Sequence, residues 1–222
     1  MKKFSIGDAV GFGWNTVKKQ PIIILYVFIA SFGAQLVNYL AGMIFGEESV
    51  INMILSITTG LFSIVLSIGL TRVLLTAYEG KPLSFPLLYS DYRKFFPYIG
   101  ASIISGFAAL LGFLLLIVPG IIIGIKMSLW PYFMIDKGMG PMQSVKASWE
   151  ATKGQTGNLF VFYLVQGLVA LLGLILIVVG LLVAIPVISL ATVYVYKKLI
   201  GDSVVNPVPA KPQPAATAPV QQ

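Results

Sequence analysis

Few residues in this sequence could do chemistry, and two of them are cations inside apolar segments. The 222 residues include no His and no Cys, so the commonest general base, the commonest zinc ligand and any thiol nucleophile are excluded. Lys126 lies seven residues after Pro119, and Arg72 is followed by six mostly apolar residues. An ionisable group inside a membrane segment is costly, so both cations are candidates for function. An unpaired cation near a membrane face favours an anionic ligand such as lipid phosphate.

Both cations also have a purely structural explanation. Neither has an Asp or Glu within its own apolar segment. A long basic side chain can bend its charge toward the headgroups while its stem stays in lipid, which is called snorkelling. We expect snorkelling for Arg72, near the end of its segment. For Lys126 both interpretations stay open, because the nearer membrane face is the one otherwise free of positive charge.

The remaining polar side chains suggest packing more than catalysis. Gln35, Asn38 and Gln166 lie inside apolar segments, and we expect hydrogen bonds between helices from them, with ligand contact as the alternative. We expect the carboxylates to form solvated pairs with lysines at the cytoplasmic surface; they are Asp8, Glu79, Asp91, Asp136 and Glu150. No phosphate loop, serine triad or metal-ligand spacing is present. We therefore expect no enzyme, no cofactor and no metal.

The composition and the apolar tracts predict that membrane-spanning helices position these residues. Apolar residues make up 57% of the chain and charged residues 10%, with a mean hydropathy of +0.91, which is typical of a membrane protein. Two of four apolar tracts have 38 residues, nearly twice the roughly 20 that one crossing needs. We predict an all-α, polytopic protein with turns at Pro119-Gly120 and around Gly180. The predicted spans are 22–45, 50–72, 98–118, 120–135, 159–179 and 181–197. A six-span domain over 1–203 precedes a disordered cytoplasmic tail rich in Pro, Ala and Gln over 204–222.

The basic residues predict the orientation of these spans. Fourteen of the 15 fall on one side, and Lys126 is the exception. This positive-inside pattern predicts an even number of crossings with both termini in the cytoplasm. The net charge of +7 is then explained by topology and anionic lipid. We expect membrane lipids as partners, with a protein partner as the alternative, and no nucleic acid.

A threefold repeat accounts for the order of the segments. A short amphipathic stretch precedes each pair of spans, and a shift of 135 positions superposes Trp14 on Trp149. In the first stretch, Ile6, Val10 and Trp14 recur at helical spacing. We predict three units, each an interfacial helix followed by a transmembrane hairpin. Trp14, Trp149 and Trp130 are predicted interfacial anchors; the alternative is a cytoplasmic ring that docks a partner or a lipid headgroup.

The stretch from Val118 to Trp149 resembles a known bacterial membrane family. It is similar to the membrane domain fused to some glycerophosphoryl diester phosphodiesterases and to free-standing, uncharacterised relatives of that domain. The resemblance rests on a proline-glycine pair, a basic residue seven after the proline, an Asp that closes the helix, and two short patterns, Ser148-Trp149-x-x-Thr152-x-Gly154 and Gly69-x-x-Arg72. It covers about residues 1–200 and implies a six-span membrane domain, which we expect in the bacterial cytoplasmic (inner) membrane. The soluble phosphodiesterase domain is not within this sequence, and no catalytic residue carries over.

Two functions follow as hypotheses. The first is binding or transport of an anionic or amphiphilic, lipid-related ligand in a groove near Lys126 and the Pro119-Gly120 turn. Its candidate ligand-binding residues are Lys126, Arg72, Gln35, Asn38 and Gln166. The alternative is a membrane scaffold that recruits a protein partner through the cytoplasmic amphipathic helices. The sequence leaves the oligomeric state open.

Overall fold

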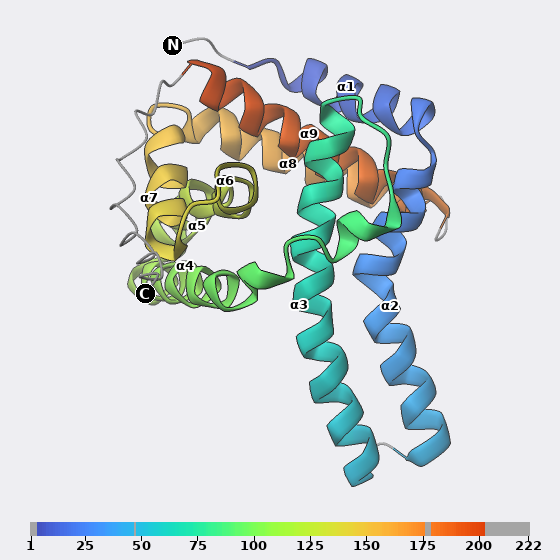
Figure 1. The fold of residues 1–222 in the computed structure, drawn as a ribbon. Helices are drawn as coiled ribbons and strands as arrows, with labels where there is room; N and C mark the ends of the chain where they lie inside the picture. Colours follow the sequence, from blue (N-terminus) through green and yellow to red (C-terminus); the bar gives the residue numbers. More distant parts are fainter. Residues whose placement is uncertain (1–3, 47, 176–178, 203–222) are drawn as a thin grey trace, which may run out of the picture.

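The computed structural model describes residues 4–46, 48–175 and 179–202, which form helices and turns with no β-strand in those ranges. The predicted tail over 204–222 lies outside the described residues. The helices, shown in Figure 1, are α1 (Ile6–Lys19), α2 (Ile22–Phe45), α3 (Val50–Tyr78), the 3₁₀ turns η1 (Phe85–Leu88) and η2 (Tyr92–Lys94), α4 (Phe95–Leu115), α5 (Ile117–Met127), α6 (Trp130–Lys137), α7 (Pro141–Ala151), α8 (Thr156–Ile175) and α9 (Val179–Asp202).

Six segments are long and apolar enough to cross a membrane, as the sequence predicts. They are Ile22–Phe45, Val50–Tyr78, Phe85–Leu115, Ile117–Lys137, Thr156–Ile175 and Gly180–Gly201. The chain is therefore all-α and has the build of a multi-pass membrane protein. The threefold repeat stays a prediction, because the stretch before the second hairpin forms η1 and η2 and not an α-helix.

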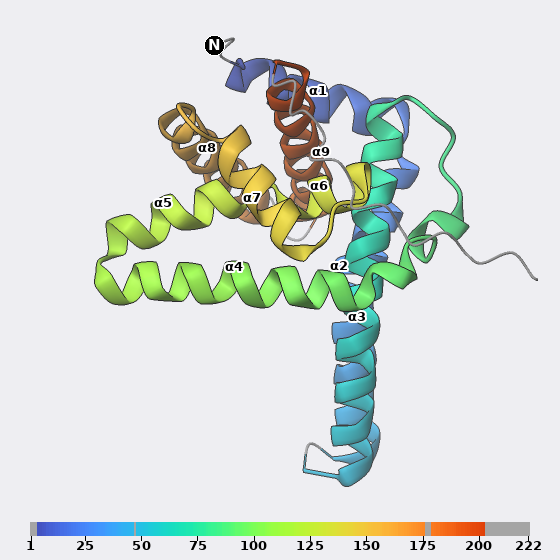
Figure 2. The same cartoon turned by 60° about the vertical axis from the view of Figure 1, so that its left-hand side comes forward.

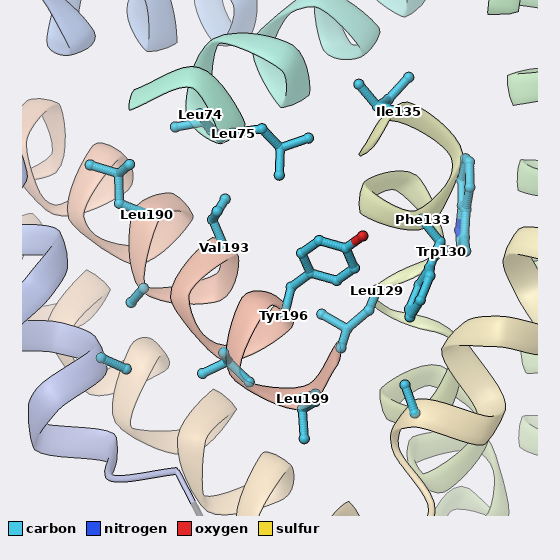
Figure 3. Packing of buried hydrophobic residues seen from close by; sticks show 14 of the residues in the cluster. Leu74, Leu75, Leu129, Trp130, Phe133, Ile135, Leu190, Val193, Tyr196 and Leu199 are labelled. Carbon is cyan, nitrogen blue, oxygen red and sulfur yellow. The ribbon is translucent and has the colours of Figure 1, made fainter. Parts of the chain in front are cut away.

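The three apolar hairpins do not stand side by side. The α4–α5 hairpin runs across the α2–α3 hairpin, whose outer half projects away from the rest of the protein (Figure 2). The inner end of α3 meets α6 and α9 in a central core, where Leu129, Phe133 and Tyr196 are almost fully buried (Figure 3). Burial of such large side chains stabilises this junction.

The first helix packs through small residues and not through its tryptophan. Ser5 caps α1 and accepts a hydrogen bond from the Asp8 N–H at 3.3 Å, as its position predicts. Gly13 contacts the Val187 backbone of α9 so closely that a Cβ at this position would overlap the Val187 carbonyl. Trp14 is 49% exposed. Close backbone approach selects the face that carries glycine, so Trp14 lies outside the packed face of α1. Its role as an interfacial anchor stays a prediction.

The turn predicted at Pro119-Gly120 is misplaced. The chain reverses at Leu116, which has extended backbone angles (φ −168°, ψ 155°), and α5 begins at Ile117. Pro119 is tolerated in the first turn of α5, since N–H groups there have no helical partner. Gly120 instead permits a close crossing of the two helices: a Cβ on Gly112 would lie 2.9 Å from the Gly120 Cα.

Two span boundaries also differ from the prediction. The predicted span 120–135 is two helices, because α5 ends at Met127 and α6 begins at Trp130. The second span continues to Tyr78 and does not end at 72. Gly180 is the second residue of α9, and Pro186 lies inside that helix. The break predicted around Gly180 falls next to residues 176–178, between α8 and α9, which lie outside the described residues.

Candidate functional site

Lys126 and Trp149, named separately from the sequence, lie in direct contact. Lys126 is in the last turn of α5, and its ammonium lies 4.3 Å from the centroid of the Trp149 ring on α7. Both residues are half-buried. A cation over an indole face is attracted by the negative charge on that face. The contact holds the ammonium at the junction of α5, α6 and α7.

Two hydroxyl groups of α7 hold the backbone of the same lysine. The Lys126 carbonyl accepts hydrogen bonds from the Ser148 hydroxyl at 2.7 Å and the Thr152 hydroxyl at 3.3 Å. The Leu129 N–H donates to Ser148 Oγ at 3.1 Å. These are backbone groups that the break between α5 and α6 leaves without helical partners. Since Ser148, Thr152 and Leu129 are fully buried, the Ser-Trp-x-x-Thr pattern fixes where α5 ends.

The Lys126 ammonium keeps donors available beyond its aromatic contact. No carboxylate forms an ion pair with it in the ranges that the structure covers. An ammonium has three N–H donors, and one aromatic face cannot satisfy all three. The local chemistry therefore suits an anion whose apolar part lies against Trp149.

The groove predicted beside Lys126 and Pro119-Gly120 differs from the hollow that is present. A cavity of about 260 Å³ opens between α4 and α5, on the side of α5 that carries Gly124 and Ser128. Its lining residues are Ser102, Ser105, Gly106, Gly124, Met127, Ser128 and Trp130. Lys126, Pro119 and Gly120 are not among them. The lysine and the cavity thus belong to one hairpin but to separate surfaces.

Arg72 has partners within the protein, so the expectation of snorkelling is wrong. Its guanidinium donates to both carboxylate oxygens of Asp91 at 2.6 and 3.1 Å and to the Ile135 carbonyl at 2.9 Å. Lys94 also binds Asp91 at 3.0 Å and donates to the Met134 carbonyl at 3.2 Å. Two cations therefore cap the last carbonyls of α6, where the helix dipole favours positive charge.

The Gly69-x-x-Arg72 pattern has a direct structural explanation. A Cβ on Gly69 would overlap the backbone of Leu88, so only glycine lets η1 lie against α3. Asp91 follows Leu88 by three residues, and Arg72 lies one helical turn beyond Gly69. The close approach at Gly69 thus brings the carboxylate to the guanidinium.

A second charged group joins α3, α6 and α9. Asp136 accepts from Lys197 Nζ and from the Tyr196 hydroxyl, each at 2.9 Å. Glu79 lies 2.6 Å from Lys81 and 3.7 Å from Lys197. The hydrogen bond from Lys81 is the main reason that the pKa of Glu79 lies below its usual value.

Lysine pairs are present for Glu79, Asp91, Asp136 and Glu150, four of the five predicted carboxylates, but two of these four are not solvated. The Asp91 and Asp136 side chains are 13% and 12% exposed. Desolvated pairs of this kind lose much when one partner is removed. Among the residues described, no group of three His, Cys, Asp or Glu side chains could hold a metal ion.

The polar residues inside the spans divide into two groups. Asn38 accepts a hydrogen bond from Thr59 of α3 at 2.6 Å, and Gln166 donates to Thr192 of α9 at 2.9 Å. The interhelical bonds predicted for these two residues are confirmed. Gln35 is exposed on α2 and has no such bond to any described residue.

The three tryptophans also differ in environment. Trp14 is exposed on α1, with Lys18 Nζ 5.6 Å from its ring centroid. Trp130 is 8% exposed and packs on Tyr98 with ring centroids 4.6 Å apart. The interfacial role predicted for Trp130 is therefore wrong, since its ring belongs to the core. Trp149 lies against Lys126.

The chain is similar to proteins of mycobacteria. It is 27% identical to the "Uncharacterized protein Rv2560" of Mycobacterium tuberculosis over 242 aligned residues, which cover 94% of this chain and 73% of the relative. The same values hold for the "Uncharacterized protein Mb2590" of Mycobacterium bovis. No protein-family model matches the chain, and neither does any solved structure.

Proposed function

We propose that this is a bacterial cytoplasmic-membrane protein that binds an anionic amphiphile, of lipid-related chemistry, at Lys126 and Trp149, and helps to move it. The contact between the Lys126 ammonium and the Trp149 ring is the observation that carries the proposal. It pairs a cation without a carboxylate partner in the described ranges with an apolar ring. An anionic headgroup would bind the ammonium, and the adjoining chain would lie against the indole.

Two further features support the proposal. The sequence resemblance is to a domain attached to enzymes of glycerophospholipid breakdown. The excess of basic residues on one side would place both termini in the cytoplasm, next to the anionic leaflet. Arg72 is not proposed as a ligand contact, because Asp91 and Ile135 already bind its Nε and Nη2 groups and Asp91 neutralises its charge.

Lipid retention tests the proposal. The wild-type protein, Lys126→Met and Lys146→Met are purified in native lipid discs, and bound lipids are quantified by mass spectrometry. Lys146 is a matched control, because it is exposed on α7, the helix that carries Trp149. We expect a loss of anionic lipid in Lys126→Met alone. An unchanged amount of bound anionic lipid in Lys126→Met would contradict the proposal.

A scaffold is the second candidate, favoured by the exposure of Trp14 on the outer side of α1. An exposed indole is typical of partner-binding surfaces as well as membrane interfaces. Crosslinking pull-downs compare the wild type with Trp14→Ala. Loss of one defined protein partner with lipid binding intact would favour the scaffold, and an unchanged set of partners would count against it.

A further inference from the structure

The outer face of α2 carries an apolar stripe that nothing in the described chain covers. Its exposed residues recur at alternating spacings of three and four: Leu25, Phe28, Phe32, Gln35 and Tyr39. The buried side chains of α2 lie on the opposite face, at positions such as Ile23, Val27 and Ala30. Alternating spacings of three and four are typical of a helix that pairs with another along one seam.

Gln35 is the polar residue of this stripe, and it lies near the middle of the span. It comes 13 residues after the start of α2 and 10 before its end, which is about 20 Å and 15 Å along the helix. A bilayer core is about 30 Å thick, so neither headgroup layer is near. Asn38, one turn further on, is bonded to Thr59, whereas Gln35 has no hydrogen bond to the described residues.

An amide at this depth is costly without a partner. Lipid tails offer no donor or acceptor, so the desolvated carboxamide loses its hydrogen bonds to water. Glutamine in a span is accordingly a residue that joins helices. The outer half of the α2–α3 hairpin projects away from the rest of the protein (Figure 1), and Phe32, Gln35 and Tyr39 of the stripe are exposed.

We propose that the outer face of α2 is the interface with a second copy of this chain, in which the two Gln35 amides bond to each other. A carboxamide carries both N–H donors and a carbonyl acceptor, so it is complementary to itself. A twofold axis at Gln35 places matching amides at the same depth, which is the geometry of an isologous dimer. The apolar residues of the stripe then pack on their counterparts, and the single amide pair sets the register.

The absence of cysteine from the sequence allows a direct test by crosslinking in native membranes. Phe28→Cys, Phe32→Cys and Tyr39→Cys place single thiols on the stripe; Val37→Cys and Leu40→Cys place them on exposed positions outside it. We expect disulfide-linked dimers from the stripe at a yield several times that of the controls. Equal yields at all positions, no dimers, or links only to a different protein would each overturn the proposal.

The amide itself is tested by energy transfer between labelled copies in bilayers. Gln35→Leu keeps an apolar side chain of similar length and removes the hydrogen bonds, so we expect dimerisation to weaken roughly three- to thirtyfold. Gln35→Asn keeps the amide and should restore part of the affinity, and Val37→Ala should leave it unchanged. Wild-type affinity in Gln35→Leu would show that the amide pair does not join the copies.

Discussion

Ser148 and Trp149, adjacent in α7, hold the two ends of one lysine. The Ser148 hydroxyl donates to the Lys126 carbonyl at 2.7 Å, and the Trp149 ring centroid lies 4.3 Å from the Lys126 ammonium. The backbone contact fixes where α5 stops, and the aromatic contact fixes where the charge lies. Lys126 and the Ser148-Trp149 pair, which begins 22 positions later in the sequence, thus form one structural unit.

The aromatic contact predicts a graded response to substitution of Trp149. Trp149→Phe keeps a ring under the ammonium and should lose little stability. Trp149→Leu removes the π-system and should cost about 0.5 to 2 kcal/mol. Thermal unfolding in detergent measures both, with Trp14→Leu as the control, since Trp14 is exposed. Equal stability of Trp149→Leu and the wild type would contradict the contact.

The hydroxyl bridge predicts a difference between two serines of α7. Ser148 and Ser144 are both fully buried, but Ser144 bonds only its own helix, at the Pro141 carbonyl. Ser148→Ala should cost about 1 to 3 kcal/mol, because it leaves the Leu129 N–H unsatisfied. Ser144→Ala should cost less. Hydrogen exchange at the Leu129 amide should accelerate in Ser148→Ala alone, and equal exchange in the two variants would count against the bridge.

The close approach of η1 to α3 predicts a strong effect at Gly69. Gly69→Ala would force the Leu88 backbone away and separate Arg72 from Asp91, so we expect a loss of about 1 to 3 kcal/mol or more. Gly60→Ala, in the same helix, has open space around its Cβ and should be neutral or slightly stabilising. Unfolding in denaturant compares them. Similar stability of the two variants would argue against the contact.

The paired donors of Arg72 predict that lysine cannot replace arginine. A lysine offers a point charge and loses the two-point contact with Asp91. Arg72→Lys should therefore destabilise by about 1 to 3 kcal/mol. Arg93→Lys is the control, because Arg93 is an exposed residue of η2. Equal melting temperatures for the two variants would mean that the Asp91 contact adds no stability.

The sequence predicts the apolar helices well because membrane-length hydrophobic runs leave few alternatives. It fails at their breaks. Proline at position 119 indicates a turn, but proline is equally stable in the first turn of a helix, which is where Pro119 lies. The break at Ser128-Leu129 has a local signal in Pro131, which lies in the first turn of α6 and favours a helix start there. The predicted turns do not include this position, and the hydrogen bonds by which α7 satisfies the freed backbone groups are a tertiary effect that local patterns do not contain.

The sequence also identifies the site residues without showing which of them contact one another. Lys126 and Trp149 both stand out from the sequence, yet no periodicity connects residues on different helices. Arg72 has no carboxylate within its own span, and its partner Asp91 lies between η1 and η2. The glycine of Gly69-x-x-Arg72 is a sequence signal for this contact. A small residue one turn before a cation in an apolar segment permits the close approach of another segment.

The fluorescence of Trp149 tests the proposed ligand site most directly. In a Trp14→Phe, Trp130→Phe background, Trp149 is the one tryptophan left of three, and the protein is placed in lipid discs with increasing fractions of anionic lipid. We expect its emission to change to a plateau as the headgroup binds Lys126, and to stay constant when Lys126→Met is added. The same response in the Lys126→Met protein, or no response in the parent, would contradict binding at Lys126.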